Sequence, residues 1–126
     1  MKNVTLFVDF NKIQQLEVIS MKRVGFLLQV KKEKIEEYKM HHENVWPEML
    51  EALRRTGWHN YSLFLRDDGL LFGYFEAEES FEASNEGMAS EEINLKWQEF
   101  MGPYFESIEG RPDENMIVLE EVFHTD

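Results

Sequence analysis

Residues 58–75 read WHNYSLFLRDDGLLFGYF, and this stretch decides the fold. Two runs rich in leucine and aromatic residues, 58–65 and 70–75, are separated by a polar Arg-Asp-Asp-Gly segment. The pair Asp68-Gly69 suits a tight turn, because glycine readily adopts the positive φ that such turns require. The stretch therefore predicts two antiparallel strands joined as a hairpin.

A strand and a helix are predicted upstream of the hairpin. Residues 23–30 (RVGFLLQV) form a short, mostly apolar run with the length of a strand. Residues 31–56 carry apolar or aromatic side chains at steps of three and four, which predicts an amphipathic helix. Pro47 lacks an N–H group and disfavours helical geometry at the residue before it, so we expect the helix to split there, with a second piece beginning at Pro47. Gly57 is expected to end that second piece.

A second helix and a last strand are predicted downstream. Residues 76–92 are rich in acidic side chains and contain no basic one, so we expect a solvated stretch that leads into a helix. Residues 93–101 repeat apolar side chains at helical spacing until Gly102-Pro103 stops the pattern. Residues 116–123 are rich in β-branched side chains and predict a last strand.

The resulting βαββαβ order, with both helices on one face of an antiparallel sheet, predicts an α+β fold of the ferredoxin-like kind. Several strands carry apolar side chains at successive positions, and so on both faces of the sheet, as at Phe26 and Leu27 and at Leu71 and Phe72. Helices on one face cannot cover all of these side chains. A second copy of the chain would cover the other face, so we predict a homodimer in which two sheets form a dimeric α+β barrel.

This plan accounts for residues 21–126, which we assign to one domain. The βαββαβ unit does not need residues 1–20, although residues 5–10 resemble a strand and residues 11–20 are weakly helical. We expect residues 1–20 to be an N-terminal extension of uncertain structure.

Charge and composition exclude several classes of function. The 126 residues include 25 acidic and 13 basic side chains, a net charge of −12, which disfavours binding to nucleic acid and to anionic membrane surfaces. No apolar run is long enough to span a membrane. The chain has no cysteine, so thiolate chemistry is excluded and a reducing compartment, the cytoplasm, is expected. Because the net charge is strongly negative, we expect a neutral or cationic ligand.

A histidine on the apolar side of the first helix is the leading catalytic candidate. Tyr38, His42 and Trp46 are spaced four residues apart, so in a continuous helix they form one stripe that faces the sheet. A buried neutral imidazole can donate a proton from one nitrogen and accept one at the other, which suits acid/base chemistry near pH 7. The alternative interpretation is a core histidine whose ring is satisfied by a backbone carbonyl.

Other chemistries find less support. His41, His42 and His59 lack the spacing of a metal site, so no metal is expected. The sequence contains no glycine-rich phosphate loop and no serine in a strand-to-helix elbow. Tyr61 is expected to share a strand face with His59, and Trp97 could turn from the second helix toward the same space. A group of aromatic residues with few polar atoms suits a neutral sugar, because the rings can cover its C–H groups while the polar atoms bind its hydroxyls.

Together these motifs resemble the L-rhamnose mutarotase family. The resemblance rests on YxxxHxxxWPE at 38–48, HNYS at 59–62, LFG at 71–73, KW at 96–97 and EVF at 121–123. It implies a dimeric ferredoxin-like barrel that interconverts sugar anomers without a cofactor. It also implies that His42 is the catalytic residue and that Tyr38, Tyr61 and Trp97 contact the sugar.

Three positions depart from the family's pattern. The family has two adjacent tryptophans in the second helix, whereas this chain has Gln98 at the second position. We expect Gln98 to contact substrate there, where its amide could replace an apolar contact by a contact to a hydroxyl. Arg111 and Glu114 flank Pro112-Asp113 in place of the asparagines of the family's Asn-Pro-Asp-Asn loop. We expect these changes to affect the choice of sugar more than the reaction.

The sequence thus favours a carbohydrate mutarotase that interconverts the α and β anomers of L-rhamnose or a related 6-deoxy-hexose. His42 is the expected general acid/base, with Tyr38 or Tyr61 as its polar partner. The predicted partners are a neutral monosaccharide and a second copy of the chain. The alternative function is a non-catalytic ligand-binding or stress-response module of the dimeric α+β barrel type. A third is a haem-handling or quinol-oxidising monooxygenase on the same fold.

Overall fold

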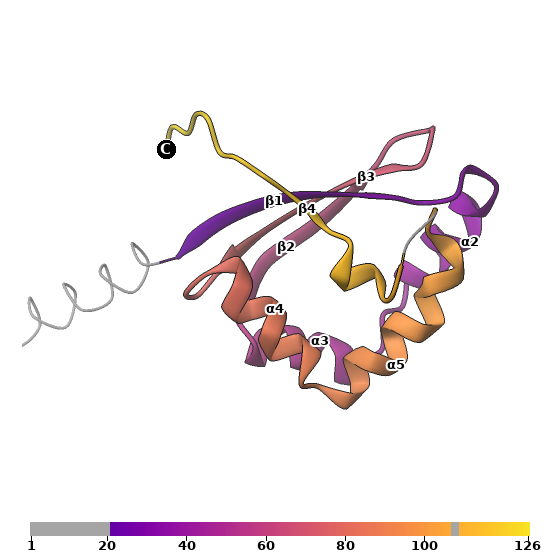
Figure 1. The fold of residues 1–126 in the computed structure, drawn as a ribbon, viewed down its shortest axis with the longest axis horizontal. Coiled ribbons are helices and arrows are strands. Elements are labelled where there is room, and N and C mark those ends of the chain that lie inside the picture. The colour runs from indigo at the N-terminus through magenta and orange to yellow at the C-terminus, as the bar shows by residue number, and fades with distance from the viewer. Residues whose placement is uncertain (1–20, 107–108) are drawn as a thin grey trace, which may run out of the picture.

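The computed structural model describes residues 21–106 and 109–126 and shows an α+β fold (Figure 1). Its strands are β1 (Lys22–Gln29), β2 (Trp58–Leu65), β3 (Leu70–Ala77) and β4 (Ile117–Leu119). Its α-helices are α2 (Ile35–His42), α3 (Pro47–Arg55), α4 (Phe81–Ala89) and α5 (Glu92–Met101). The strands form an antiparallel sheet in the order β2-β3-β1-β4, and the helices lie on one face of it (Figure 1). This confirms the predicted ferredoxin-like class, while the extension predicted at residues 1–20 lies outside the described residues.

The hairpin forms where the sequence predicts it. Gly69 has a φ of 94° in the turn, and its N–H donates to the carbonyl oxygen of Arg66 at 2.9 Å. A Cβ atom at this position would lie 2.1 Å from the carbonyl oxygen of Val30, so the turn has no room for a side chain. Strand β3 extends two residues beyond the predicted end, because Ala77 pairs with both Lys22 and Trp58.

The core lies between the sheet and the helices, and Phe26 is at its centre. Phe26 on β1 pairs with Gly73 on β3 and is fully buried. A Cβ atom at Gly73 would lie 2.1 Å from Cζ of Phe26, so the phenyl ring occupies the space that a side chain on β3 would otherwise fill. The ring also packs edge-on against Phe75 and tilted against Tyr61. Gly73 is therefore required for packing rather than for a turn.

The first helical segment splits at the predicted place. Helix α2 ends at His42 and α3 begins at Pro47, while Trp46 has an extended backbone with φ −54° and ψ 131°. Trp46 thereby leaves the line of α2 and packs against Trp97, with ring centroids 4.9 Å apart. The continuous stripe of residues 38, 42 and 46 is not formed. Gly57, with a φ of 87°, follows α3 as predicted.

Helix α4 is a structured element where the sequence predicts a solvated stretch leading into a helix. Ser80 caps it, since its Oγ accepts a hydrogen bond from the N–H of Ala83 at 3.0 Å. Ser84 and Met88 are buried on its inner face, and the Ser84 hydroxyl donates to the carbonyl oxygen of Gly57 at 3.2 Å. The expectation was incomplete because this inner face is made largely of small and polar residues, which give little hydrophobic periodicity.

Strand β4 is shorter than the predicted strand at 116–123. It pairs with β1 only where Ile117, Val118 and Leu119 lie opposite residues 27, 26 and 25. Beyond that point Glu121 contacts Arg23 through the side chains, with Oε2 and Nε 2.6 Å apart. The predicted length was wrong because residues 120–123 do not pair with β1, although β1 continues to Lys22, and β-propensity alone does not fix where pairing stops.

The sheet face opposite the helices is apolar and exposed. Phe64, Phe72, Ile117 and Leu119 lie there, and the side chains of Phe64 and Ile117 are 60% and 62% exposed. The rings of Phe64 on β2 and Phe72 on β3 are 6.2 Å apart, and we call the patch formed by these four side chains the outer face. Apolar side chains thus occur on both sides of the sheet, as the sequence indicates.

Candidate active site

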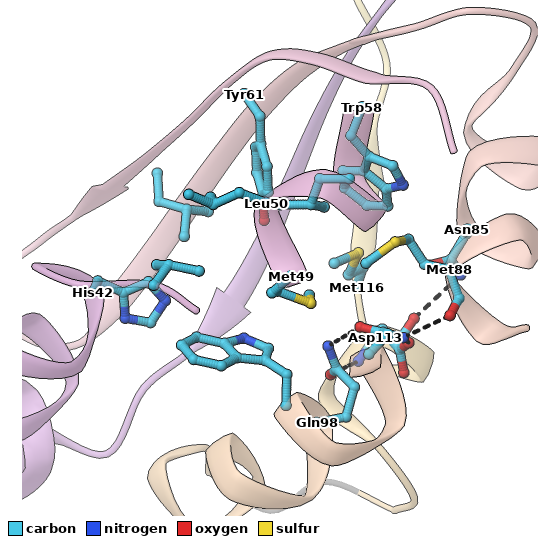
Figure 2. Close-up of a pocket in the computed structure, with 15 residues that line it drawn as sticks. His42, Met49, Leu50, Trp58, Tyr61, Asn85, Met88, Gln98, Asp113 and Met116 are labelled. Carbon is cyan, nitrogen blue, oxygen red and sulfur yellow. Dashed lines mark hydrogen bonds between the residues drawn. The ribbon is translucent and has the colours of Figure 1, made fainter. Parts of the chain in front are cut away.

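A cavity of about 350 Å³ lies between the inner face of the sheet and helices α3, α4 and α5 (Figure 2). This volume is at the small end of the range for ligand pockets in proteins. One wall is apolar and is formed by Val45, Met49, Leu50, Leu53 and Met88. The remaining lining includes aromatic rings and a polar group made of Asn85, Asn94, Gln98 and Asp113. The cavity therefore offers an apolar wall and hydrogen-bonding groups to one small ligand.

His42 lines this cavity from the last turn of α2. Its Nδ1 is 2.8 Å from the carbonyl oxygen of Tyr38, and a carbonyl can only accept, so we infer that Nδ1 carries a hydrogen. In the neutral ring Nε2 is then the acceptor, and it has no hydrogen-bond partner among the described residues. The carbonyl contact foreseen for a core histidine is present, yet it uses one nitrogen and leaves the other unused.

The environment keeps His42 neutral at ordinary pH. Burial lowers the pKa of the imidazole below its usual value of 6.5, because the charged form loses solvation. The hydrogen bond to Tyr38 opposes this effect, and the charge on nearby His41 adds to it, but burial dominates. A neutral imidazole with its Nε2 lone pair available is the form needed for a general base.

Two tyrosines line the same spaces as His42. The ring of Tyr38 lies 4.2 Å from the His42 ring, and both rings line a smaller space of about 60 Å³ beside the main cavity. Tyr61 lines both spaces, and Figure 2 shows its hydroxyl directed into the main cavity. Burial raises the pKa of both hydroxyls well above 10.0, so both keep their protons at neutral pH. They are therefore hydrogen-bond donors.

A bulge in β2 gives Tyr61 its direction. The pairing with β3 shifts between His59 and Ser62, and Asn60 in the bulge has a φ of 48°. The extra residue places Tyr61 on the same side as Trp58, with ring centroids 5.2 Å apart. The side chain of His59 does not lie on this side of the strand, and its Nε2 is 2.8 Å from Oε1 of Glu78. The expectation that Tyr61 and His59 share a face was wrong because simple alternation does not hold across a bulge.

Trp97 is a further aromatic neighbour of His42. It comes from α5, is 7% exposed and meets the His42 ring edge-on with centroids 5.5 Å apart. Its indole N–H has no hydrogen-bond partner in the described part of the chain. The structure thus brings Tyr38, His42, Tyr61 and Trp97, four of the five residues singled out from the sequence, to one place.

Gln98, the fifth, also lines the cavity, but its amide is bonded to the protein. Its Nε2 donates to Oδ1 of Asn94 at 3.0 Å, and its Oε1 accepts from the backbone N–H of Asp113 at 3.0 Å. Nδ2 of Asn94 in turn donates to Oδ2 of Asp113 at 3.0 Å. These three bonds close a circuit, the Asn94–Gln98–Asp113 ring, which fastens α5 to the short 3₁₀ turn η3 (Pro112–Glu114).

Asn94 and Asp113 were not among the site residues expected from the sequence. Asn94 lies four residues before Gln98, so both occupy one helical face, and that spacing was a usable signal. Asp113 is 5% exposed, and its Oδ1 accepts from Nε of Arg111 at 2.9 Å. Its place in the cavity depends on a chain reversal after α5 that local patterns do not reveal.

The remaining histidines serve other contacts. His41 faces away from the cavity, with Nε2 2.9 Å from the hydroxyl of Tyr104 and its ring against Phe100. Within residues 21–106 and 109–126, no group of three or more metal-ligating side chains is placed to hold a metal ion. None of the helices described is long and apolar enough to cross a membrane.

Comparison with known proteins assigns the family. The family model for L-rhamnose mutarotase matches residues 23–125. The chain is 41% identical to the L-rhamnose mutarotase of Oceanobacillus iheyensis and 39% identical to that of Bacillus subtilis, in each case over 84% of this chain and all of the relative. The crystal structure of an L-rhamnose mutarotase from Formosa agariphila superimposes with a TM-score of 0.69, at 29% identity over 83% of this chain and 99% of that one. The chain therefore belongs to the L-rhamnose mutarotase family.

Proposed function

We propose that this protein catalyses the interconversion of the α and β anomers of L-rhamnose or a related 6-deoxy-hexose, with His42 as general acid/base. The observation that carries the proposal is the arrangement of His42, whose Nδ1 is fixed by the Tyr38 carbonyl and whose Nε2 is unused beside a small cavity. The family assignment supports the choice of reaction, because the similar proteins are named L-rhamnose mutarotase.

The reaction requires two proton transfers. Nε2 of His42 takes the proton of the anomeric hydroxyl, the C1–ring oxygen bond breaks as the aldehyde forms, and the resulting imidazolium gives that proton to the ring oxygen. Rotation about the C1–C2 bond and closure on the other face reverse both transfers. The Tyr38 or Tyr61 hydroxyl, each kept protonated by burial, is the polar partner that hydrogen-bonds to the sugar oxygens. Positioned acid/base groups contribute about 10²–10⁴-fold each, enough for a reaction that already proceeds in water.

The lining suits a neutral sugar with an apolar substituent. Met49, Leu50 and Leu53 form a wall that can contact C–H groups and a methyl group. The indole of Trp97 and the hydroxyl of Tyr61 supply donors within the same cavity. No step in the mechanism requires a cofactor.

We further propose that two copies of the chain pair through the outer face. Phe64, Phe72 and Ile117 form an exposed apolar surface of the kind that marks interaction sites, and a second sheet would cover it. Light scattering coupled to size exclusion checks this at micromolar concentration, where a monomeric mass would contradict it.

The absence of cysteine supports a reducing compartment such as the cytoplasm.

Saturation-transfer NMR with L-rhamnose tests the activity. Catalysis transfers saturation between the α and β anomeric protons at a rate proportional to protein concentration. A non-catalytic binding module would broaden these resonances without transferring saturation. The second outcome would refute the proposed function while leaving the family and the fold unaffected.

A further inference from the structure

Asp113 is a buried carboxylate beside a cavity whose proposed ligand is neutral. It is 5% exposed and lines both the main cavity and the smaller space next to it. His42 also lines both spaces, and Figure 2 shows His42 and Asp113 apart from each other among the residues that line the main cavity. The acid/base mechanism uses His42 and assigns no task to Asp113.

The neighbours of Asp113 hold its carboxylate in place but do not occupy all of its hydrogen-bond acceptor positions. Oδ1 accepts from Nε of Arg111 at 2.9 Å, and Oδ2 accepts from Nδ2 of Asn94 at 3.0 Å. The backbone N–H of Asp113 is bonded to Gln98, so the residue is held from three sides. A carboxylate has about four acceptor positions, so two are left on a group that cannot donate when ionised.

Geometry relates Asp113 to one part of the sugar. A pyranose placed with its anomeric centre at Nε2 of His42 can direct a remote ring carbon toward Asp113, because the two residues line the same cavity and stand apart in Figure 2. Sugar hydroxyls are donors, and a hydrogen bond from a hydroxyl to an ionised carboxylate is among the stronger ones that a protein makes. The apolar wall at Met49 and Leu50 offers no competing acceptor.

We propose that Asp113 is a substrate-binding residue that determines specificity, its carboxylate accepting a hydrogen bond from a ring hydroxyl remote from the anomeric carbon. This inference rests on the proposed mutarotase function and deepens it. It identifies the preferred ligands as sugars that carry a donor hydroxyl at that position, and it predicts rejection of analogues that lack the hydroxyl or carry a methyl ether there.

The test compares Asp113→Asn with Glu114→Gln, using L-rhamnose and its single-deoxy analogues at ring carbons 2, 3 and 4. Glu114 is the matched control, because its replacement removes the same charge one position along the same turn and Glu114 does not line the cavity. For each variant, kcat/KM for an analogue is divided by kcat/KM for L-rhamnose. This ratio is taken within one sample, so a smaller folded fraction in Asp113→Asn does not alter it.

We expect the wild-type protein and Glu114→Gln to discriminate against one analogue by roughly 10-fold or more, the scale of a lost hydrogen bond to a charged group. Asp113→Asn should bring that ratio to within about 3-fold of unity and raise KM for L-rhamnose more than it lowers kcat. If Asp113→Asn keeps the wild-type ratios, or if the wild-type protein accepts all three analogues equally, Asp113 is structural only and the inference fails.

Failure of the proposed function gives a different result. A protein that binds L-rhamnose without exchanging its anomers shows no saturation transfer with any sugar. The same ratios are then taken from dissociation constants measured by NMR titration, and they still decide whether Asp113 contacts a remote hydroxyl. If Asp113→Asn leaves those ratios unchanged as well, the inference is overturned independently of the reaction.

Discussion

The Nδ1–H of His42 donates to the carbonyl oxygen of Tyr38, 2.8 Å away and one helical turn earlier. This contact sets the tautomer of the ring and holds it beside the cavity with Nε2 unused. Tyr38 and His42 lie four residues apart in α2, so the helix itself orients the side chain of His42. The spacing of the two residues therefore places the proposed base.

Replacing His42 by alanine should reduce anomer exchange by about 10²-fold or more, because the only group assigned to accept the anomeric proton is lost. His41→Ala is the matched control, since His41 is adjacent in sequence but contacts Tyr104 and Phe100 outside the cavity. Saturation-transfer NMR gives the exchange rate and circular dichroism gives the fold. Equal loss of activity in both variants would contradict the assignment.

The exchange rate should rise with pH below neutrality and become constant by about pH 7. Burial lowers the pKa of His42 below 6.5, and only the neutral ring can accept a proton. The same shift affects stability. Between the lowered folded pKa and 6.5 the unfolded chain binds more protons at this group, so the free energy of unfolding increases with pH across that window.

Urea titrations at several pH values measure the stability effect. The wild-type protein should lose stability as pH falls below about 6.5, and His42→Ala should lose less over the same range. An identical pH dependence in the two proteins would show that His42 does not carry the effect. A rate that increases toward acid pH would instead indicate that the protonated ring is the active form.

Replacing Gln98 by leucine should lower the free energy of unfolding by about 1–3 kcal/mol, since the N–H of Asp113 and Oδ1 of Asn94 lose their partner. Glu99→Leu is an exposed control on the same helix.

The sequence alone predicts that Gln98→Trp tightens sugar binding by about 1 kcal/mol through stacking. The two hydrogen bonds give a reason to expect weaker binding instead, and an NMR titration with L-rhamnose distinguishes these outcomes.

Gly73→Ala should destabilise the protein by about 1–3 kcal/mol or more, because the added methyl group would meet Cζ of Phe26 at 2.1 Å. Gly102→Ala is the control, with no atom within 4 Å of the added group. Thermal unfolding monitored by circular dichroism measures both. A change in Gly73→Ala no larger than that in Gly102→Ala would show that the strands separate enough to admit the methyl group.

Phe64→Lys should shift the proposed dimer toward monomer, since it places a charge on the outer face. Met40→Lys is the matched control, because Met40 is similarly exposed, 55% against 60% for Phe64, but lies on α2 away from that face. Light scattering of both variants and of the wild-type protein gives the masses. A dimer that tolerates Phe64→Lys would place the interface elsewhere.

Local signals were sufficient for most of the fold. Asp68-Gly69 marks a turn through its own backbone preference, and Pro47 interrupts a helix through its own missing N–H group. Such effects act within a few residues, so they can be read along the chain. The length of β4 depends on where its backbone pairing with β1 stops, and the β-propensity of residues 120–123 does not carry that information.

The site was predictable to a similar degree and for the same reason. His42 and Tyr38 are one turn apart, so their contact follows from helix geometry. Trp97 and Tyr61 were placed near the candidate site from their positions on the predicted helix and strand, and the family resemblance implied that they contact the sugar. The direction of Tyr61 depends on a bulge, and the burial of Asp113 depends on the turn η3 returning to α5. These are tertiary events without a local signature.

The Asn94–Gln98–Asp113 ring has a consequence for how this protein can change over evolutionary time. Asn94 and Gln98 each use one side-chain donor and one side-chain acceptor within the circuit, so a replacement at either position breaks two bonds at once. Asp113 contributes Oδ2 and its backbone N–H, so a replacement of its side chain breaks one bond. The cost of the first replacement is then larger than the cost of the next, and the energetic effects do not add. Single-step drift at these positions is penalised, and a descendant with a different polar end of the cavity would have to exchange the three residues as a linked set.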